Sequence, residues 1–219
     1  SALEKGGISE NRLAESVKKI LKTKYLLGLQ NLKSINSENI NQDLNNTSHA
    51  ELSEKLYANA ITLLKDEKNL LPLSCSETYY YLPLEEAPFQ TFVENLNLGT
   101  TAKVISKNEI AQIPENSTVI VGFHKDNSTA YKSYKISQES KDILAELSKK
   151  QNVILDVFGS PYALKDIDIT KISTVLVSYE NNDLSMKASA KALLGKTKIS
   201  GKLPVIVNEN LKAGSGIEK

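Results

Sequence analysis

The sequence has few of the residues that build metal sites or covalent cross-links: one cysteine, two histidines and no tryptophan among 219 residues. Cys75 alone excludes a disulfide within the chain, and with only His49 and His124 beside it there is no Cys/His spacing for zinc. No stretch approaches the roughly 18 apolar residues that a membrane-spanning helix needs. We therefore predict no metal site, no internal disulfide and no membrane segment.

The sequence also lacks a charge excess of either sign, since 27 Lys and Arg face 26 Asp and Glu. Nucleic acids and anionic membranes attract basic surfaces, so this balance gives no electrostatic reason to expect either partner. We predict a neutral partner and no nucleic acid.

Motifs for nucleotide binding and for nucleophilic catalysis are missing as well. No glycine-rich loop joins an early apolar run to a helix, and the close pair Gly214 and Gly216 comes after the last such run. No G-x-S-x-G sequence is present, and Cys75, without a motif around it, is expected in the core or as inert surface. The sequence predicts no cofactor.

Apolar residues at helical spacing come first. They predict a helix from Ser9, its N-cap, to Gly28. Residues 31–47 are rich in Asn and Ser without periodicity, which is typical of a linker. A second helix is expected from Ser48, in capping-box spacing with Glu51, through Leu64. The chain also lacks Met at position 1, which suggests a segment excised from a longer polypeptide.

Short apolar runs then alternate with helical patterns. Expected strands cover residues 79–82, 102–105, 118–123, 153–158, 174–179 and 203–207, and expected helices cover 89–96, the stretch after Ser137, and 184–194. Runs such as VIVGF and VILDVF are apolar on both faces, as parallel strands covered by helices must be. We predict a doubly wound, three-layer αβα sandwich with a mostly parallel sheet of about five or six strands, preceded by helices and a linker.

Ligands of open parallel sheets bind beyond the carboxyl ends of the strands. Two such segments carry candidate substrate-adjacent residues: His124, Asp126 and Asn127 after the 118–123 run, and Gly159, Ser160 and Tyr162 after the 153–158 run. Polar and aromatic side chains of this kind can hydrogen-bond to a sugar and stack on it. The alternative, an ordinary connecting loop with Tyr162 used for packing, stays open.

Four segments together resemble one family, the family 3 glycoside hydrolases. In chain order they are GGISENRLAESVKKILKTKYLLGL, AITLLKDEKNLLPL, FGSPYAL and ISGKLPVIVNENLKAGSGI. The departures are mild: the family more often has Ser at Ala60, and Asn at Asp66 and Ser160. The resemblance implies that residues 1–47 are the last helix of a barrel domain plus a linker, and that 48–219 are the C-terminal αβα domain.

In that family a two-domain enzyme removes β-linked sugars with retention, using an Asp nucleophile on the barrel. Retention needs a second group about 5 Å away to protonate the leaving oxygen. The resemblance thus implies a barrel of the same polypeptide and a carbohydrate as partners, no catalytic residue in this chain, and an isolated chain without activity. It also suggests a periplasmic or secreted protein, although the compartment stays open.

The family resemblance favours the β-N-acetylglucosaminidase branch over the β-glucosidase branch. The latter uses a Glu from the second domain after a middle strand, and residues 124–137 contain no Glu and only one carboxylate, Asp126. The former uses a His and Asp pair on a barrel loop and needs no acid from this domain. A non-catalytic carbohydrate-binding or protein-interaction module with the same fold is the alternative.

Overall fold

The computed structural model describes residues 1–34, 37–126, 128–129 and 131–219. The chain divides into two compact units, Ser1–Asn46 and Thr47–Lys219. None of the helices in these ranges combines the length and the apolar character that crossing a bilayer requires.

The first unit is helical, and its described residues form no buried core. Helix α1 (Glu10–Leu26) is capped by the Ser9 side chain, which accepts a hydrogen bond from the Arg12 amide, as predicted. The 3₁₀ helix η1 (Leu29–Asn31) and helix α2 (Ile40–Leu44) follow, and none of the residues in these three helices is buried. Helix α2 lies within the predicted linker, residues 31–47, where the sequence shows no helical periodicity, so the sequence analysis missed this short helix.

The second unit is built on a six-stranded sheet with the order β1-β6-β5-β4-β2-β3. The strands are β1 (Thr62–Asp66), β2 (Thr78–Leu84), β3 (Thr101–Val104), β4 (Thr118–His124), β5 (Asn152–Phe158) and β6 (Thr174–Val177). All neighbours pair in parallel except β1, which pairs with β6 antiparallel. The predicted sandwich with a mostly parallel sheet is confirmed.

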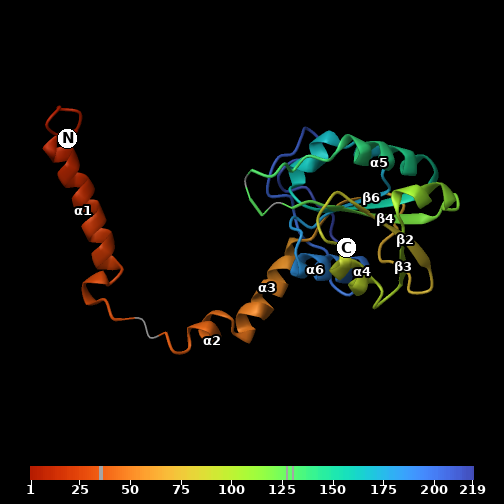
Figure 1. Cartoon of the computed structure of the whole chain (residues 1–219), viewed down its shortest axis with the longest axis horizontal. Coiled ribbons are helices and arrows are strands. Elements are labelled where there is room, and N and C mark those ends of the chain that lie inside the picture. Colours follow the sequence, from red (N-terminus) through yellow and green to blue (C-terminus); the bar gives the residue numbers. More distant parts are fainter. Residues whose placement is uncertain (35–36, 127, 130) are drawn as a thin grey trace. The chain divides into compact units, whose positions relative to one another are not determined.

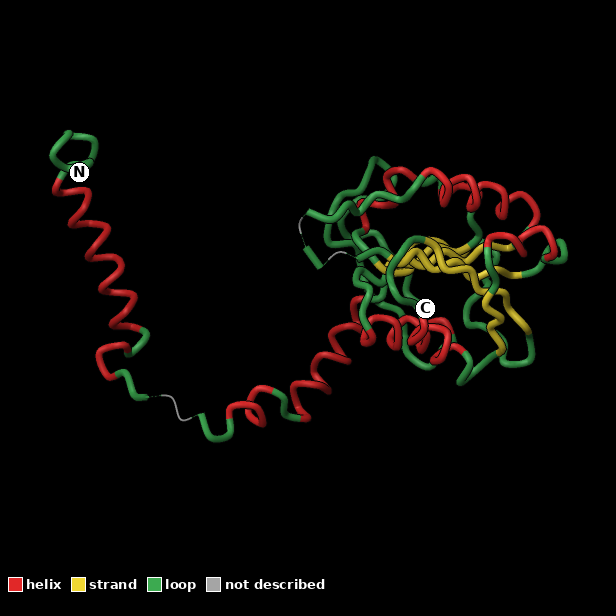
Figure 2. Tube along the Cα trace, in the orientation of Figure 1, coloured by secondary structure: helices red, strands yellow, loops and turns green. Residues whose placement is uncertain are grey.

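Helices cover both faces of this sheet (Figures 1 and 2). One face carries α3 (Thr47–Ala60), α4 (Gln90–Leu96) and α6 (Asp183–Leu193), and the other carries α5 (Gln138–Lys150). The 3₁₀ helices η2 (Lys107–Gln112), η3 (Pro161–Asp166) and η4 (Ile169–Lys171) lie in the connections. Ser137 caps α5, and Gly195 ends α6 with a φ of 68°, which glycine adopts without strain.

Two apolar clusters form the core, one on each face. Alternate residues of each strand separate between them: in β4, Val119, Val121 and Phe123 face α5, and Ile120 faces α4 and α6. The strands are therefore apolar on both faces for the reason inferred from the sequence.

Three local expectations were wrong. The second helix ends at Ala60, because Leu63 and Leu64 belong to β1, whose partner is β6. It begins at Thr47, so Ser48 lies in its first turn instead of capping it. Residues 203–207 form no strand: the edge next to β6 is already taken by β1, and Leu203 and Val207 instead cover the α5 face of the sheet as loop residues.

Cys75 is exposed, so of the two expected positions, core and surface, it occupies the surface.

Candidate functional site

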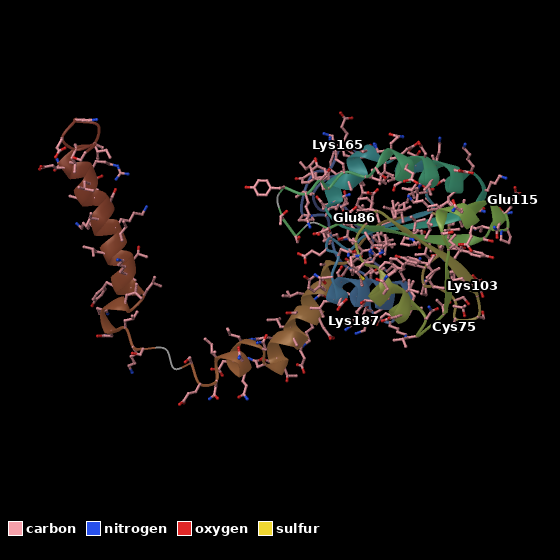
Figure 3. The ribbon with its side chains drawn as sticks, viewed as in Figure 1. Cys75, Glu86, Lys103, Glu115, Lys165 and Lys187 are labelled. Carbon is pink, nitrogen blue, oxygen red and sulfur yellow. The ribbon has the colours of Figure 1, made fainter. Side chains whose placement is uncertain are left out.

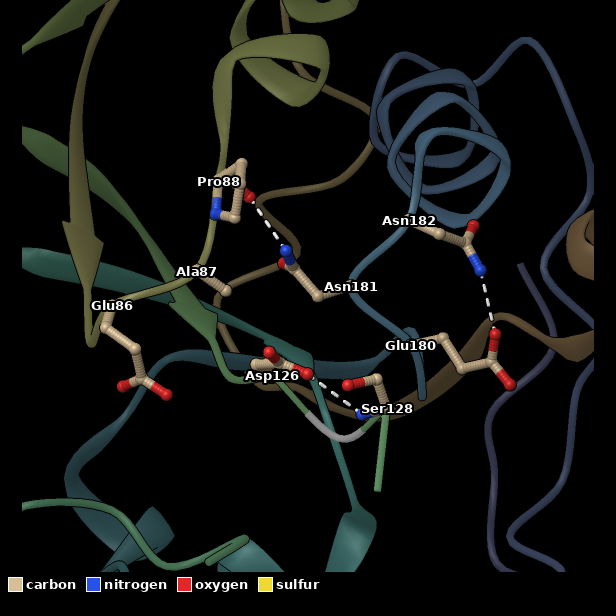
Figure 4. A pocket seen from close by; sticks show the side chains of 8 residues that line it. All are labelled: Glu86, Ala87, Pro88, Asp126, Ser128, Glu180, Asn181 and Asn182. Carbon is tan, nitrogen blue, oxygen red and sulfur yellow. Dashed lines mark hydrogen bonds between the residues drawn. The ribbon is translucent and has the colours of Figure 1, made fainter. Parts of the chain in front are cut away.

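Four parallel strands, β2, β4, β5 and β6, end at the same edge of the sheet. A pocket of about 590 Å³ opens at this edge (Figure 4). Its lining residues come from the connections that follow β2, β4 and β6: Glu86, Ala87, Pro88, Asp126, Ser128, Glu180, Asn181 and Asn182. The pocket thus lies where parallel α/β sheets usually bind ligands.

Three carboxylates line the pocket, one from each connection, and every one has a partner. Glu86 accepts a hydrogen bond from Lys125 at 2.9 Å (Figure 3 labels Glu86). Glu180 accepts from the Tyr57 hydroxyl at 2.6 Å and from the Asn182 amide at 2.7 Å. These contacts fix the carboxylates as hydrogen-bond acceptors around the pocket.

Asp126, a predicted site residue, lines the pocket and forms an ion pair with Lys132. It also accepts a 2.9 Å hydrogen bond from the Ser128 amide (Figure 4). The Lys132 ammonium and the Ser128 hydrogen bonds hold the pKa of this carboxyl well below its usual range. Asp126 is therefore ionised at neutral pH and holds no proton to donate.

His124, also predicted, is fully buried below the pocket and does not line it. Its ring is stacked on Phe158, with centroids 4.6 Å apart and planes at 7°. One ring nitrogen, Nδ1, lies 2.6 Å from Oδ1 of Asn181, and the other is hydrogen-bonded to the Tyr81 hydroxyl. Burial lowers the pKa of His124 to about 4, so the ring is neutral at pH 7.

Gly159, Ser160 and Tyr162, predicted from the segment after β5, do not line the pocket. Ser160 is the N-cap of η3, where its hydroxyl accepts from the Tyr162 amide at 3.4 Å, and Pro161 is the first residue of that helix, as expected. Tyr162 is partly exposed, and the centroid of its ring lies 6.1 Å from that of Tyr134. Gly159 is buried beside Lys125 and Phe123. Asn127 lies outside the described residues.

Sequence reasoning missed the part of the pocket that follows β2 and β6. Glu86, Pro88, Glu180, Asn181 and Asn182 come directly after these strands. Ligands of parallel sheets bind beyond the carboxyl ends of the strands, and this rule led to His124. The same rule, applied to strands 78–84 and 174–177, points to these five residues.

The pocket offers carboxylate acceptors, amide donors and one serine hydroxyl, which is the set of groups that binds a neutral polyhydroxyl ligand. Within the described part of the chain, no cluster of three or more His, Cys, Asp or Glu side chains could hold a metal ion.

Several known proteins are similar to this chain in sequence or in fold. No family model matches the sequence. The chain is 26% identical over 216 residues to β-glucosidase C of Emericella nidulans, covering 96% of this chain and 34% of that protein. The fold matches a β-glucoside phosphorylase with a TM-score of 0.72 at 22% identity, covering 94% of this chain and 40% of that one.

A β-N-acetylglucosaminidase of glycoside hydrolase family 3 from Paenibacillus matches with a TM-score of 0.64 at 21% identity, over 94% of this chain and 41% of that one. The chain spans about a third of the curated β-glucosidase it matches. It is thus similar to a glycosidase domain of the family 3 type, and the comparisons do not single out the β-N-acetylglucosaminidases over the β-glucosidases.

Proposed function

We propose that this chain is the second domain of a retaining β-glycosidase and shapes the active-site pocket of a barrel domain in the same polypeptide. The observation that carries the proposal is the similarity of nearly the whole chain to about a third of a β-glucosidase. A polar pocket at the carboxyl edge of the sheet, formed by three connections, supports it. The ligand would be a sugar, bound through its hydroxyl groups.

The barrel partner is supported by helix α1. Its apolar side chains Leu13, Val17, Ile20 and Leu21 recur at helical spacing and are between 42% and 58% exposed. An apolar stripe of this length normally packs against another element. We propose that the barrel covers it.

Within this function we propose the β-N-acetylglucosaminidase branch, because the connection after β4 contains no Glu that could serve as the acid. Asp126 is the only carboxylate among the described residues between His124 and Ser137, and its ion pair with Lys132 keeps it ionised. A general acid must hold a proton at the working pH. The proton for the leaving group would then come from the barrel.

The test compares two proteins on aryl β-glucosides and aryl β-N-acetylglucosaminides. The longer polypeptide should hydrolyse one of these substrates, with the N-acetylglucosaminide preferred, and the 219-residue chain should hydrolyse neither. Turnover by the chain alone would require a catalytic pair within it. A longer polypeptide that binds sugar without hydrolysis would instead favour a non-catalytic carbohydrate-binding module.

A further inference from the structure

A directed chain of hydrogen bonds runs from the core to the pocket. The Tyr81 hydroxyl is bonded to Nε2 of His124, and Nδ1 of His124 lies 2.6 Å from Oδ1 of Asn181. Nδ2 of Asn181 donates to the carbonyl of Pro88 at 2.8 Å, the contact drawn in Figure 4. Asn181 and Pro88 both line the pocket, whereas Tyr81 and His124 are fully buried.

The direction of every bond follows from the Pro88 carbonyl, which can only accept. It must therefore face the NH₂ group of Asn181, and this orientation turns Oδ1 toward His124. An amide oxygen also only accepts, so Nδ1 of His124 carries the proton. In a neutral ring Nε2 is then the acceptor, and the Tyr81 hydroxyl donates to it.

The surroundings of His124 hold this arrangement in place. Phe158 stacks on the ring, and Phe89 and Phe92 lie with their centroids 6.1 and 6.4 Å away. A Cβ at Gly122 would overlap both the Tyr81 hydroxyl and Nε2 of His124, so only glycine leaves room for their hydrogen bond. Asp156 is the ionisable side chain whose charge acts on Tyr81, and it is itself buried and hydrogen-bonded to Ser178 and Ser189.

Asn181 has a donor left over. One N–H of its amide is used by Pro88, and the second has no partner among the residues that the structure describes. We propose that His124 is a positioning residue, which fixes the Asn181 amide so that this second N–H serves as a hydrogen-bond donor to a hydroxyl or acetamido oxygen of a sugar in the pocket. The identity of the ligand rests on the proposed function, whereas the positioning of Asn181 does not.

The positioning is tested by nitrogen-15 NMR of the ring nitrogens in the 219-residue chain, between about pH 5.5 and 8 and without ligand. The expected result is a single tautomer with the proton on Nδ1 and an unprotonated Nε2. A proton on Nε2, or averaging between the two tautomers, would overturn the proposal. His49, which lies outside the sheet in α3, gives a second set of ring-nitrogen signals in the same spectrum, with which those of His124 are compared.

Two substitutions separate positioning from a merely structural role. His124→Asn keeps a donor near the place of Nδ1, and His124→Leu removes it. In His124→Asn the two side-chain N–H signals of Asn181 should stay sharp and separate from each other. In His124→Leu these signals should change. Identical Asn181 signals in both variants would contradict the proposal. If His124→Leu does not fold, the tautomer of the unmodified chain still decides.

The ligand contact is tested in the longer glycosidase by Asn181→Ala. Loss of one hydrogen bond made equally in the ground state and the transition state should raise KM about tenfold with kcat little changed. An unchanged KM would overturn the donor role. If the longer protein hydrolyses no glycoside while the tautomer is as expected, the proposed function fails and the positioning of Asn181 stands.

Discussion

The carboxylate of Glu85 accepts a 2.9 Å hydrogen bond from the backbone amide of Ser137, the N-cap of α5. The same carboxylate lies 3.2 Å from Nζ of Lys125. One side chain, only 6% exposed, therefore holds both ends of the connection after β4, whose first part lines the pocket. Glu85 does so with a φ of 67°, a region that residues other than glycine rarely adopt.

Glu85→Ala should lower the free energy of unfolding by about 2 kcal/mol, because it leaves the Lys125 ammonium and the Ser137 amide without their buried acceptor. Glu86→Ala is the matched control, since Glu86 bonds the same lysine but is 58% exposed. Its effect should stay within about 0.5 kcal/mol. Urea unfolding of both variants measures this, and equal effects would show that Glu85 does not hold the connection.

Asp156 is a buried acid in β5, hydrogen-bonded to Ser178 at 2.7 Å and to Ser189. Burial raises its pKa to about 6, so the folded chain binds this proton more tightly than the unfolded chain does. Asp156 therefore costs no stability below about pH 4 and costs about 3 kcal/mol above about pH 6. Asp156→Asn should remove that cost and raise the free energy of unfolding at about pH 7.5, measured by urea unfolding, and an unchanged value would contradict the raised pKa.

The effect of His124 on stability depends on pH in the opposite sense to that of Asp156. Its pKa, lowered to about 4 by burial, lies below the unfolded value of about 6.5, so stability is lost as the pH falls through this range. Between about pH 4 and 6 the two groups oppose each other in the unmodified chain. In Asp156→Asn the His124 dependence is no longer opposed by Asp156, and stability should rise with pH from about 4 to 6.5. Carboxylates whose pKa is lowered in the fold, such as Glu85, add to this rise only at its acid end, so the part above about pH 5.5 reports His124. Thermal unfolding across this range that shows no such rise would contradict the account.

Gly122→Ala should destabilise the domain by about 2 kcal/mol, because the added methyl group overlaps Tyr81 and His124 in a packed core. Gly159→Ala is the control: its nearest neighbour, Cβ of Lys125, is 3.3 Å away and can give slightly. Its cost should be clearly smaller. The melting temperatures of both variants test this. Equal melting temperatures for Gly122→Ala and the unmodified chain would show that the hydrogen bond between Tyr81 and His124 is not tightly packed.

The sequence predicted those elements whose local signals agree with their tertiary role. Strands β4 and β5 have long apolar runs, and α5 has a serine cap, so all three were found. The prediction failed where the local pattern fits both a helix and a strand. Leu63 continues the helical spacing of α3, and only the pairing with β6 makes it part of a strand.

The candidate site divides in the same way. Asp126 was predicted because it follows a strand with a long apolar run, and it does line the pocket. His124 was predicted as a loop residue but is the last residue of β4, so its side chain points into the core face by the two-residue period of the strand. Its link to Asn181, 57 residues later, depends on strand order, which local sequence does not specify.

The most direct test of the central claim is turnover by the Asp126→Asn variant of the proposed longer glycosidase, measured with aryl β-glycosides of good and poor leaving groups. If this domain shapes the pocket without supplying the acid, turnover should fall only a few-fold, and equally for both leaving groups. Loss of a general acid would lower it by about 10²–10⁴-fold, with rescue by the good leaving group. That second result would make Asp126 the acid and contradict a purely pocket-shaping role for this domain.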